Sequence, residues 1–500
     1  MHLKTDSDRT RANYSSTAET LPMIEISEDG TATTSNGIAT ITGNEYANGT
    51  VKSRKKSAGS ISATEENTAR PDDKVAAIQR TKGTSATSGL LNFICGMIGP
   101  GCFSVAASFK LAGLWAGMGL LFLMGGLSLI SMHKIVRCSQ YLATIIGDQT
   151  LDYGDMANEA CKHSFSKFRR HGKIAKWIVN GSLLTFQLGV LSVCFVFVSD
   201  HIIEIVQYFN NDKPVPLSSQ EIMLIYFFPQ LLLSFIGNIK LITYLSLAGN
   251  FIIFTAIALI IKELLTHTHY NSSDLPWITD LNGISLSAGA LIYSFEGQAM
   301  VLPLENSLRH GEDMRGFTGV LSTAMNLVIL FYAFLGFFGY LTFGSETLGS
   351  LTLNLPNNLI SVIVKILLTT KVFVGSALQL YVIVEMLWPI ISQRLERKWL
   401  LKLGPYFLRA ALTLFSLCLA ISVPNLVNII PLVGITSGML LSLILPSCLD
   451  SLVFLYYLHK KGDKFWFYAK LIENTILFVL GWFFLVTGLQ STIQQLVHGS

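Results

Sequence analysis

The stretch Gly96-Met97-Ile98-Gly99-Pro100-Gly101 interrupts the first of a series of long apolar segments in this sequence. A helix that crosses a bilayer keeps its backbone hydrogen bonds within itself. Pro100 lacks a backbone donor and clashes with the preceding turn, and the glycines let the chain leave helical geometry. The sixth apolar segment carries a second interruption, Ser294-Phe295-Glu296-Gly297, followed by Pro303. These clusters indicate either broken membrane helices or kinks with a close-packing face of small residues, and we favour broken helices.

The composition places most of the chain in lipid. Hydrophobic residues make up 51% of the 500 residues and charged residues 14%, whereas a soluble chain carries about 25% charged residues. Runs of roughly twenty apolar residues, the length that crosses about 30 Å of hydrocarbon, recur along residues 90–497. We therefore predict an all-α integral membrane protein with about eleven transmembrane helices. The predicted spans are 88–112, 115–133, 178–198, 222–236, 242–261, 284–304, 319–343, 359–387, 407–423, 429–455 and 471–496.

The two interrupted spans are related by their places in the chain. Spans 1 and 6 lie five spans apart and run in opposite directions. This is the relation of equivalent helices in two inverted repeats of five spans. The eleventh span is then an extra helix.

The distribution of Lys and Arg sets the orientation. Basic residues cluster before span 1 and in the connections after spans 2, 8 and 10, which places these segments in the cytoplasm. Residues 1–84, rich in Ser, Thr, Asn and Gly, are predicted to be a disordered cytoplasmic tail. Residues 85–496 form the transmembrane domain, and residues 497–500 form a short tail on the other side. The sequon Asn271-Ser272-Ser273 falls on that non-cytoplasmic side, where a glycan can be attached.

Broken helices leave backbone groups free to bind a ligand. Free amides and the positive end of a half helix suit a carboxylate, and free carbonyls suit an ammonium group. A zwitterionic amino acid satisfies both. Gln187 in span 3 and Gln379 in span 8 either contact this substrate or join neighbouring helices. The predicted substrate-binding residues are Met97, Ile98, Gly99, Pro100, Gly101, Ser294, Phe295, Gly297, Gln187 and Gln379.

Four separated strings resemble the proton-coupled amino acid transporters of the amino acid/auxin permease superfamily, whose relatives include vacuolar and lysosomal types. The strings are Gly99-Pro100-Gly101 within residues 92–113, Asp152-Tyr153-Gly154-Asp155, Phe295-Glu296-Gly297-Gln298-Ala299-Met300-Val301-Leu302-Pro303-Leu304-Glu305-Asn306 and Ala377-Leu378-Gln379-Leu380-Tyr381-Val382. The resemblance covers most of residues 85–489. It implies a leucine-transporter-like fold, small neutral amino acids as substrates and proton coupling.

Three positions depart from the pattern of that family. Asn92 stands where mammalian members carry a histidine in the first helix. Pro100 replaces a threonine of many members, and Gly375 replaces a hydroxyl residue in span 8. The resemblance therefore implies the fold more firmly than the identity of the coupled ion.

Two charges fall near the middle of the membrane. Counting about 1.5 Å per residue places Glu296 roughly 18 Å into span 6 and Lys371 roughly 18 Å into span 8, both from the outer side. An intramembrane charge marks a pathway by default, so we predict that both residues take part in coupling. Glu296 either carries the coupled proton or is neutralised by Lys371, and Lys371 can also replace a bound metal ion as a tethered cation.

Four acidic residues fall near the predicted cytoplasmic boundary, where a solvated or snorkelling role is expected. They are Glu305, Glu385, Asp450 and Glu473.

The remaining patterns argue against an enzyme. The sequence has no nucleotide-binding loop and no nucleophile elbow, so we predict no catalytic residue and no cofactor. The seven cysteines match no metal-binding spacing, and the near-neutral tail offers no nucleic-acid argument. The predicted partners are a small amino acid, a proton and the lipid bilayer.

Several alternatives stay open. The chain can be an amino acid sensor with little flux, in which the tail binds a signalling partner, or a sodium-coupled or uncoupled carrier. An enzyme acting on lipid would need a convergent set of polar residues at one leaflet, which the sequence lacks. A twelve-span fold conflicts with the odd number of spans. The plasma membrane and the lysosomal or vacuolar membrane are both compatible with the sequence.

Overall fold

The computed structural model describes residues 80, 83–147, 150–211, 213–236, 239–393, 395 and 397–498, without the side chains of 239–247 and 498. These residues are almost entirely helical, and their one extended pairing is an isolated bridge between Thr84 and Leu308. Residues 1–79 of the predicted tail, and the last two residues of the chain, lie outside the described residues.

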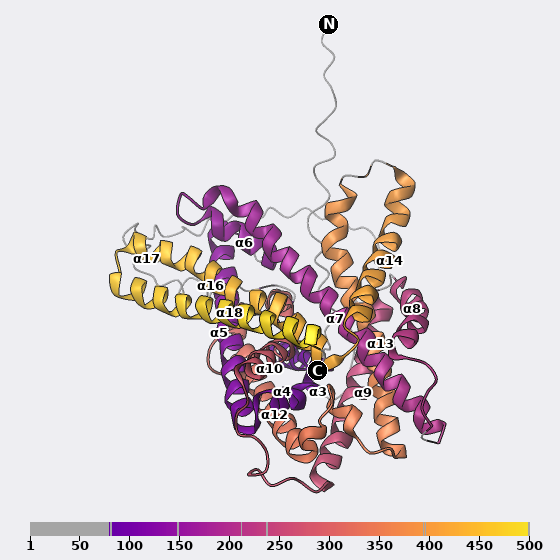
Figure 1. Ribbon diagram of the computed structural model, residues 1–500. Helices are drawn as coiled ribbons and strands as arrows, with labels where there is room; N and C mark the ends of the chain where they lie inside the picture. Colours follow the sequence, from indigo (N-terminus) through magenta and orange to yellow (C-terminus); the bar gives the residue numbers. More distant parts are fainter. Residues whose placement is uncertain are drawn as a thin grey trace, which may run out of the picture.

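The helices group into the eleven predicted spans (Figure 1). In the described part of the chain, eight helices are long and apolar enough to cross a membrane individually. The other three spans are the two interrupted ones and the 16-residue α8. The spans in order are α2 (Ala86–Met97), α3 (Pro100–Phe103) and α4 (Val105–Ala112); α5 (Leu114–Ile146); α7 (Gly172–Phe209); α8 (Ser219–Ser234); α9 (Ile239–Thr266); α10 (Leu281–Ser294) and α11 (Gln298–Ser307); α12 (Val320–Phe343); α13 (Leu359–Ser392); α14 (Lys398–Ser422); α15 (Leu426–Val433) through α17 (Tyr456–Lys461); and α18 (Lys464–His498).

Both predicted helix breaks are confirmed. Helix α2 ends at Met97, and Ile98 and Gly99 are extended, with Gly99 at φ −145° and ψ −161°. Pro100 then starts α3 at its first position, where the missing amide would have no helical partner. In span 6, α10 ends at Ser294, and α11 begins after Gly297. The two interruptions follow from local sequence alone.

Many of the contacts between the spans have the symmetry of an inverted repeat. Spans 2 and 7 pack on each other, as do spans 3 and 8. Span 1 packs on span 7, just as span 6 packs on span 2. Spans 4 and 9 each pack on both span 3 and span 8. Span 5 packs on span 8, just as span 10 packs on span 3. If each span is exchanged with the span five places away, such as span 1 with span 6, the same list of contacts between spans results. The leucine-transporter-like fold of five plus five spans, with one extra helix, is confirmed.

Large apolar side chains cover the outside of the bundle. Phe228 and Leu232 of α8 are 66% and 70% exposed, and Phe251 of α9 is 70% exposed. An exposed apolar surface of this kind suits contact with lipid rather than with water. The chain is therefore a multi-pass integral membrane protein.

Span 10 is wider than an ordinary α-helix. Between α15 and α17 it contains the π-helical turns η5 (Gly434–Gly438), η6 (Leu440–Ile444) and η7 (Ser451–Leu455), separated in part by α16 (Leu445–Asp450). π-Turns are rare and frequently lie at functional sites. The sequence patterns described above do not predict these π-helical turns.

We use "tail side" for the membrane face at which α2 begins and "far side" for the opposite face. Helix α6 (Tyr153–Lys162) connects spans 2 and 3 on the tail side, and α17 joins α18 there. In Figure 1 these connections, and the one between α13 and α14, lie toward the top. Asn271 lies on the far side and is exposed.

The expectation that all four boundary acids are solvated is wrong for two of them. Glu305 is 1% exposed and Asp450 is 0% exposed, whereas Glu385 is exposed and the Glu473 side chain is 46% exposed. Glu305 pairs with Arg80 at 3.2 Å and accepts a bond from Gln140 at 3.0 Å. Depth counted along one helix cannot reveal such partners because they come from distant segments.

Asp450 sits in a second buried charge cluster that joins spans 2, 10 and 11. Its carboxylate lies 3.5 Å from the ammonium of Lys134 and 3.1 Å from that of Lys470, and it accepts a 2.8 Å hydrogen bond from Asn474. Lys134 also contacts Glu473 at 2.5 Å. Buried charges of this kind are stable only when they are paired.

Candidate functional site

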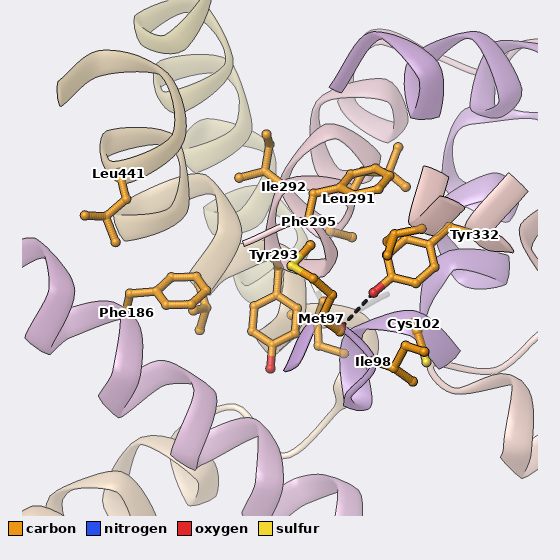
Figure 2. Close-up of a cluster of buried hydrophobic side chains, with 14 of the residues drawn as sticks. Met97, Ile98, Cys102, Phe186, Leu291, Ile292, Tyr293, Phe295, Tyr332 and Leu441 are labelled. Atoms are coloured by element: carbon orange, nitrogen blue, oxygen red, sulfur yellow. Dashed lines mark hydrogen bonds between the residues drawn. The ribbon is translucent and has the colours of Figure 1, made fainter. Parts of the chain in front are cut away.

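The two helix breaks face each other and are held by side-chain hydrogen bonds. Ser294 at the end of α10 donates its hydroxyl to the carbonyl of Gly101 at 2.8 Å. Tyr332 of α12, fully buried, donates its hydroxyl to the carbonyl of Met97 at 2.8 Å and to that of Ser294 at 3.3 Å. Figure 2 shows Tyr332 directed at Met97 from the neighbouring helix. The Tyr332 hydroxyl thus forms hydrogen bonds with one carbonyl from each break, that of Met97 and that of Ser294.

Other backbone groups at the breaks are left for a ligand. Among the described residues, the amides of Gly99 and Gly101 have no protein acceptor, and the carbonyls of Phe295 and Glu296 have no protein donor. A Cβ built on Gly99 would meet no atom within 4 Å. Open space beside unpaired amides is what the carboxylate of a ligand requires.

Lys371 reaches the first break from span 8. Its ammonium donates to the carbonyl of Ile98 at 3.0 Å, and its side chain is half-buried. From the other side, Gly249 of α9 approaches closely, since a Cβ there would lie 3.3 Å from Cγ of Lys371. A lysine at a carbonyl freed by a helix break occupies a position suited to a small cation.

Glu296 belongs to a different set of contacts. One carboxylate oxygen accepts from the backbone amide of Gln298 at 3.0 Å, and the other accepts from the hydroxyl of Ser442 at 2.7 Å. The first contact places the carboxylate at the positive N-terminal end of α11. In the part of the chain that is described, Glu296 and Lys371 do not form an ion pair. The sequence-based pairing of these two residues is therefore absent from this structure.

The other predicted site residues divide into two groups. Gln187 is 9% exposed, and its buried amide oxygen has no hydrogen-bond partner among the described residues. Gln379 is half-buried and lies two helical turns beyond Lys371 on the same face of α13. Phe295, by contrast, is fully buried, with its ring centroid 5.1 Å from that of Tyr332. Its side chain is part of the core, and only its backbone lies at the break.

Gly297 is also enclosed by protein. A Cβ at this position would lie 2.8 Å from Sδ of Met97 and 3.1 Å from Cε of Met132. Met97 and Ile98 themselves are 5% and 4% exposed. These residues form the walls around the breaks, and the unpaired backbone groups come from Gly99, Gly101 and the Phe295-Glu296 segment.

No sequence pattern marks three of the residues at the site. Tyr332 and Ser442 bind the breaks from spans 7 and 10, and Tyr293 packs its ring 5.9 Å from that of Phe186 in span 3 (Figure 2). A lone serine or tyrosine inside an apolar span carries no pattern that reveals its partner. The geometry, two broken helices facing each other with unpaired backbone groups at mid-membrane, defines a membrane carrier of the inverted-repeat class.

Comparison with known proteins identifies the family. Residues 82–493 match the family model described as transmembrane amino acid transporter protein. The chain is 28% identical over 427 residues to the probable amino acid transporter skat-1 of Caenorhabditis elegans, covering 82% of this chain and 90% of that one. It is 26% identical over 420 residues to the proton-coupled amino acid transporter-like protein pathetic of Drosophila melanogaster, covering 83% and 86%. This chain therefore belongs to the transmembrane amino acid transporter family.

A solved structure of the nucleobase-cation-symport-1 family transporter Mhp1, in a closed conformation with bromovinylhydantoin bound, aligns over 85% of this chain and 93% of its own. Its TM-score is 0.48 and its sequence identity is 10%. A similarity at that level carries no argument about this chain.

Proposed function

We propose that this chain is a secondary active transporter that moves small neutral amino acids by alternating access around a site between spans 1 and 6. The observation that carries the proposal is the open space beside Gly99, next to amides that have no protein acceptor among the described residues. These amides bind the substrate carboxylate, and the carbonyls of Phe295 and Glu296 bind its ammonium group. Gln187 and Gln379 line the site and contribute hydrogen bonds.

We propose proton coupling through Glu296. A desolvated carboxylate must take up a proton or find a cation, and Glu296 contacts only uncharged donors among the described residues. The separate engagement of Lys371 with Ile98 favours this role over permanent neutralisation by Lys371. Lys371 acts as a tethered cation in place of a bound metal ion. The name of the Drosophila relative, a proton-coupled amino acid transporter-like protein, points in the same direction.

We propose that the tail side is cytoplasmic, which makes residues 1–84 a cytoplasmic tail and the exposed Asn271 a glycosylation site on the extracytoplasmic or luminal face. The plasma membrane and the lysosomal or vacuolar membrane are the two places where such a carrier serves. In both, external or luminal acid drives the substrate toward the cytoplasm.

The test is uptake by the purified full-length chain in liposomes. Labelled small neutral amino acids are offered with an imposed proton gradient, an imposed sodium gradient, or none. Accumulation driven by the proton gradient alone supports the proposal. Accumulation driven only by the sodium gradient would indicate a sodium-coupled carrier instead. Equilibration of the labelled substrate across the membrane without accumulation would indicate an uncoupled carrier. Saturable binding without flux would identify a sensor.

A further inference from the structure

A group of buried polar atoms beneath the second break has no protein partner. In the described part of the chain, both amide atoms of Gln298 and the hydroxyls of Tyr153, Ser128 and Ser131 lack hydrogen-bond partners. Tyr153 is 5% exposed, and the other three residues are fully buried. More than about 90% of buried polar groups in proteins are hydrogen-bonded, and ordered water supplies the bond where protein does not.

Ser128 and Ser131 lie on the face of α5 that is directed at the boundary between spans 6 and 10, which we call the seam. On α5, a Cβ at Gly125 would lie 2.6 Å from Cγ1 of Ile329 in span 7 and 3.2 Å from Cζ of Phe295 in span 6, and Cys138 lies 4.0 Å from Asp450 in span 10. At about 100° per residue, Cys138 is rotated roughly 140° from Gly125. About the axis of α5, Ser128 and Ser131 are rotated from Gly125 by about 60° and 120° in the same direction as Cys138. They therefore lie between the contacts made by Gly125 and Cys138.

Glu296 sits in the same seam, since its carboxylate accepts the hydroxyl of Ser442 from span 10. Tyr153 reaches this region from α6, which packs against α5 and α16. Burial, and the charges of Glu296 and Cys138, raise the pKa of the Tyr153 phenol well above its usual value. Glu296 of the second break and Cys138 of α5 are thus both near enough to act on the phenol.

The seam is separated from the substrate side of span 6. Where a Cβ of Gly297 would lie, Met97, Met132 and Phe93 are all within 3.3 Å. Toward the tail side the seam ends at the Asp450 cluster, in which Lys134 contacts the partly exposed Glu473. Along span 10, Ser442 at Glu296 and Asp450 at the tail-side cluster therefore mark the two ends of the seam, away from the substrate side of span 6.

We propose that ordered water fills this seam between α5, α6, α11 and span 10, and that it is the route by which the proton leaves Glu296 for the cytoplasm. The inference rests on the proposed role of Glu296 as proton carrier. The protonated carboxylic acid gives its proton to the adjacent water, and Tyr153 accepts one proton while passing its own to the next water. The net step moves one proton and leaves Tyr153 unchanged. Proton and substrate then leave by different routes.

The experiment compares two rates in liposomes containing the full chain: uptake driven by a pH gradient, and exchange of labelled for unlabelled substrate at equal pH. Tyr153→Phe removes one hydroxyl and keeps the ring. We expect driven uptake to fall at least tenfold and exchange to stay within twofold of the unmodified chain, with a larger slowing in D2O. Tyr208→Phe, at the far-side end of α7, is the matched control and should change neither rate.

A second variant, Ser128→Ala combined with Ser131→Ala, tests the route without touching α6. Unchanged driven uptake in both variants would overturn the water route, and equal loss of exchange and driven uptake would assign these residues a structural role instead. Glu296→Gln is measured in parallel. If it keeps pH-driven accumulation, the proposed coupling itself fails; if it loses accumulation while Tyr153→Phe does not, only the route fails.

Discussion

Gly99 combines two properties that make it a direct probe of the substrate site. Its backbone is extended at φ −145°, a conformation open to any residue, and no atom lies within 4 Å of the place where a Cβ would stand. A side chain at this position therefore extends into the space beside the free amides without straining the fold.

We expect Gly99→Val to express and fold like the unmodified chain and to bind substrate about a hundredfold more weakly, a loss of roughly 2.7 kcal/mol. The measurement is equilibrium binding of a labelled amino acid to the purified protein. The matched control is Gly119→Val, since Gly119 also has no neighbour within 4 Å and lies on the exposed face of α5. Unweakened binding by Gly99→Val would show that the first break is only a kink.

Glu296→Gln mimics the protonated carboxylic acid. The amide keeps an oxygen that can accept from Gln298 or Ser442. We expect exchange to continue and accumulation driven by a pH gradient to disappear, because the variant has no proton to release. Exchange and driven uptake are measured on the same liposomes. Full retention of driven accumulation would rule out Glu296 as the carrier.

The sequence draws attention to residues whose own chemistry needs an explanation, and it does not reveal residues that act through a partner. Glu296, Lys371 and the glycines are visible because a charge or a helix breaker in an apolar segment needs an explanation. Tyr332 and Ser442 are ordinary residues in spans 7 and 10, and only the fold brings them to the breaks. The burial of Phe295 against Tyr332 was missed for the same reason.

At the scale of elements, the segment that precedes α2 is attached to the end of α11. Thr84 and Leu308 form the isolated bridge, and the guanidinium of Arg80 donates to the carbonyls of Glu305 and Leu308 at 2.7 and 3.1 Å. Arg80 also pairs with the buried carboxylate of Glu305. These contacts hold the tail-side half of span 1 against span 6.

Arg80→Ala should loosen this attachment, because removing one partner of a buried ion pair costs about 3–5 kcal/mol. We expect the half-buried Cys95 of α2 to react at least tenfold faster with a membrane-impermeant thiol reagent applied from the tail side. Labelling is measured with the other six cysteines replaced by serine. Arg309→Ala, at an exposed position beside the bridge, is the control, and an unchanged rate in Arg80→Ala would show that the contact does not hold α2.

The elements that local sequence specifies were predicted well. Gly99 and Pro100 lie at the break after α2, and Gly297 lies at the break after α10, so both breaks could be placed from the sequence. The π-turns of span 10 could not be placed from the sequence, because no local residue pattern marks them. The first of these turns begins at Gly434, which packs closely on span 6: a Cβ there would lie 1.9 Å from the backbone carbonyl oxygen of Gly289.

At the scale of the whole molecule, the inverted repeat fixes which connections share a face. Helix α6 follows two spans and the connection from α17 to α18 follows ten, so both lie on one side, whereas Asn271 follows five spans and lies on the other. This arrangement could be predicted because the number of apolar segments and the distribution of basic residues both belong to the sequence. The contacts between the repeats could not be predicted, since they join residues hundreds of positions apart.

We expect single cysteines at Lys167 and Lys461 to be labelled only from the cytoplasm and one at Asn271 only from the opposite face. Each is introduced into a chain whose native cysteines are replaced, and labelling is compared in intact and permeabilised cells. Labelling of the Lys461 and Asn271 positions from the same side would contradict the proposed topology and the inverted relation of spans 1 and 6.

The contact between Lys371 and the carbonyl of Ile98 has an electrical consequence. A metal ion bound at that carbonyl would cross the membrane with the substrate and carry current, whereas the ammonium of Lys371 stays attached to its helix. With the proton coupling proposed above, each turnover would then transfer only the charge of the proton, because a zwitterionic substrate contributes none. Membrane voltage would act on the cycle with about 2.3 kcal/mol per 100 mV, the value for a single elementary charge. The ratio of charge moved to amino acid moved should be one.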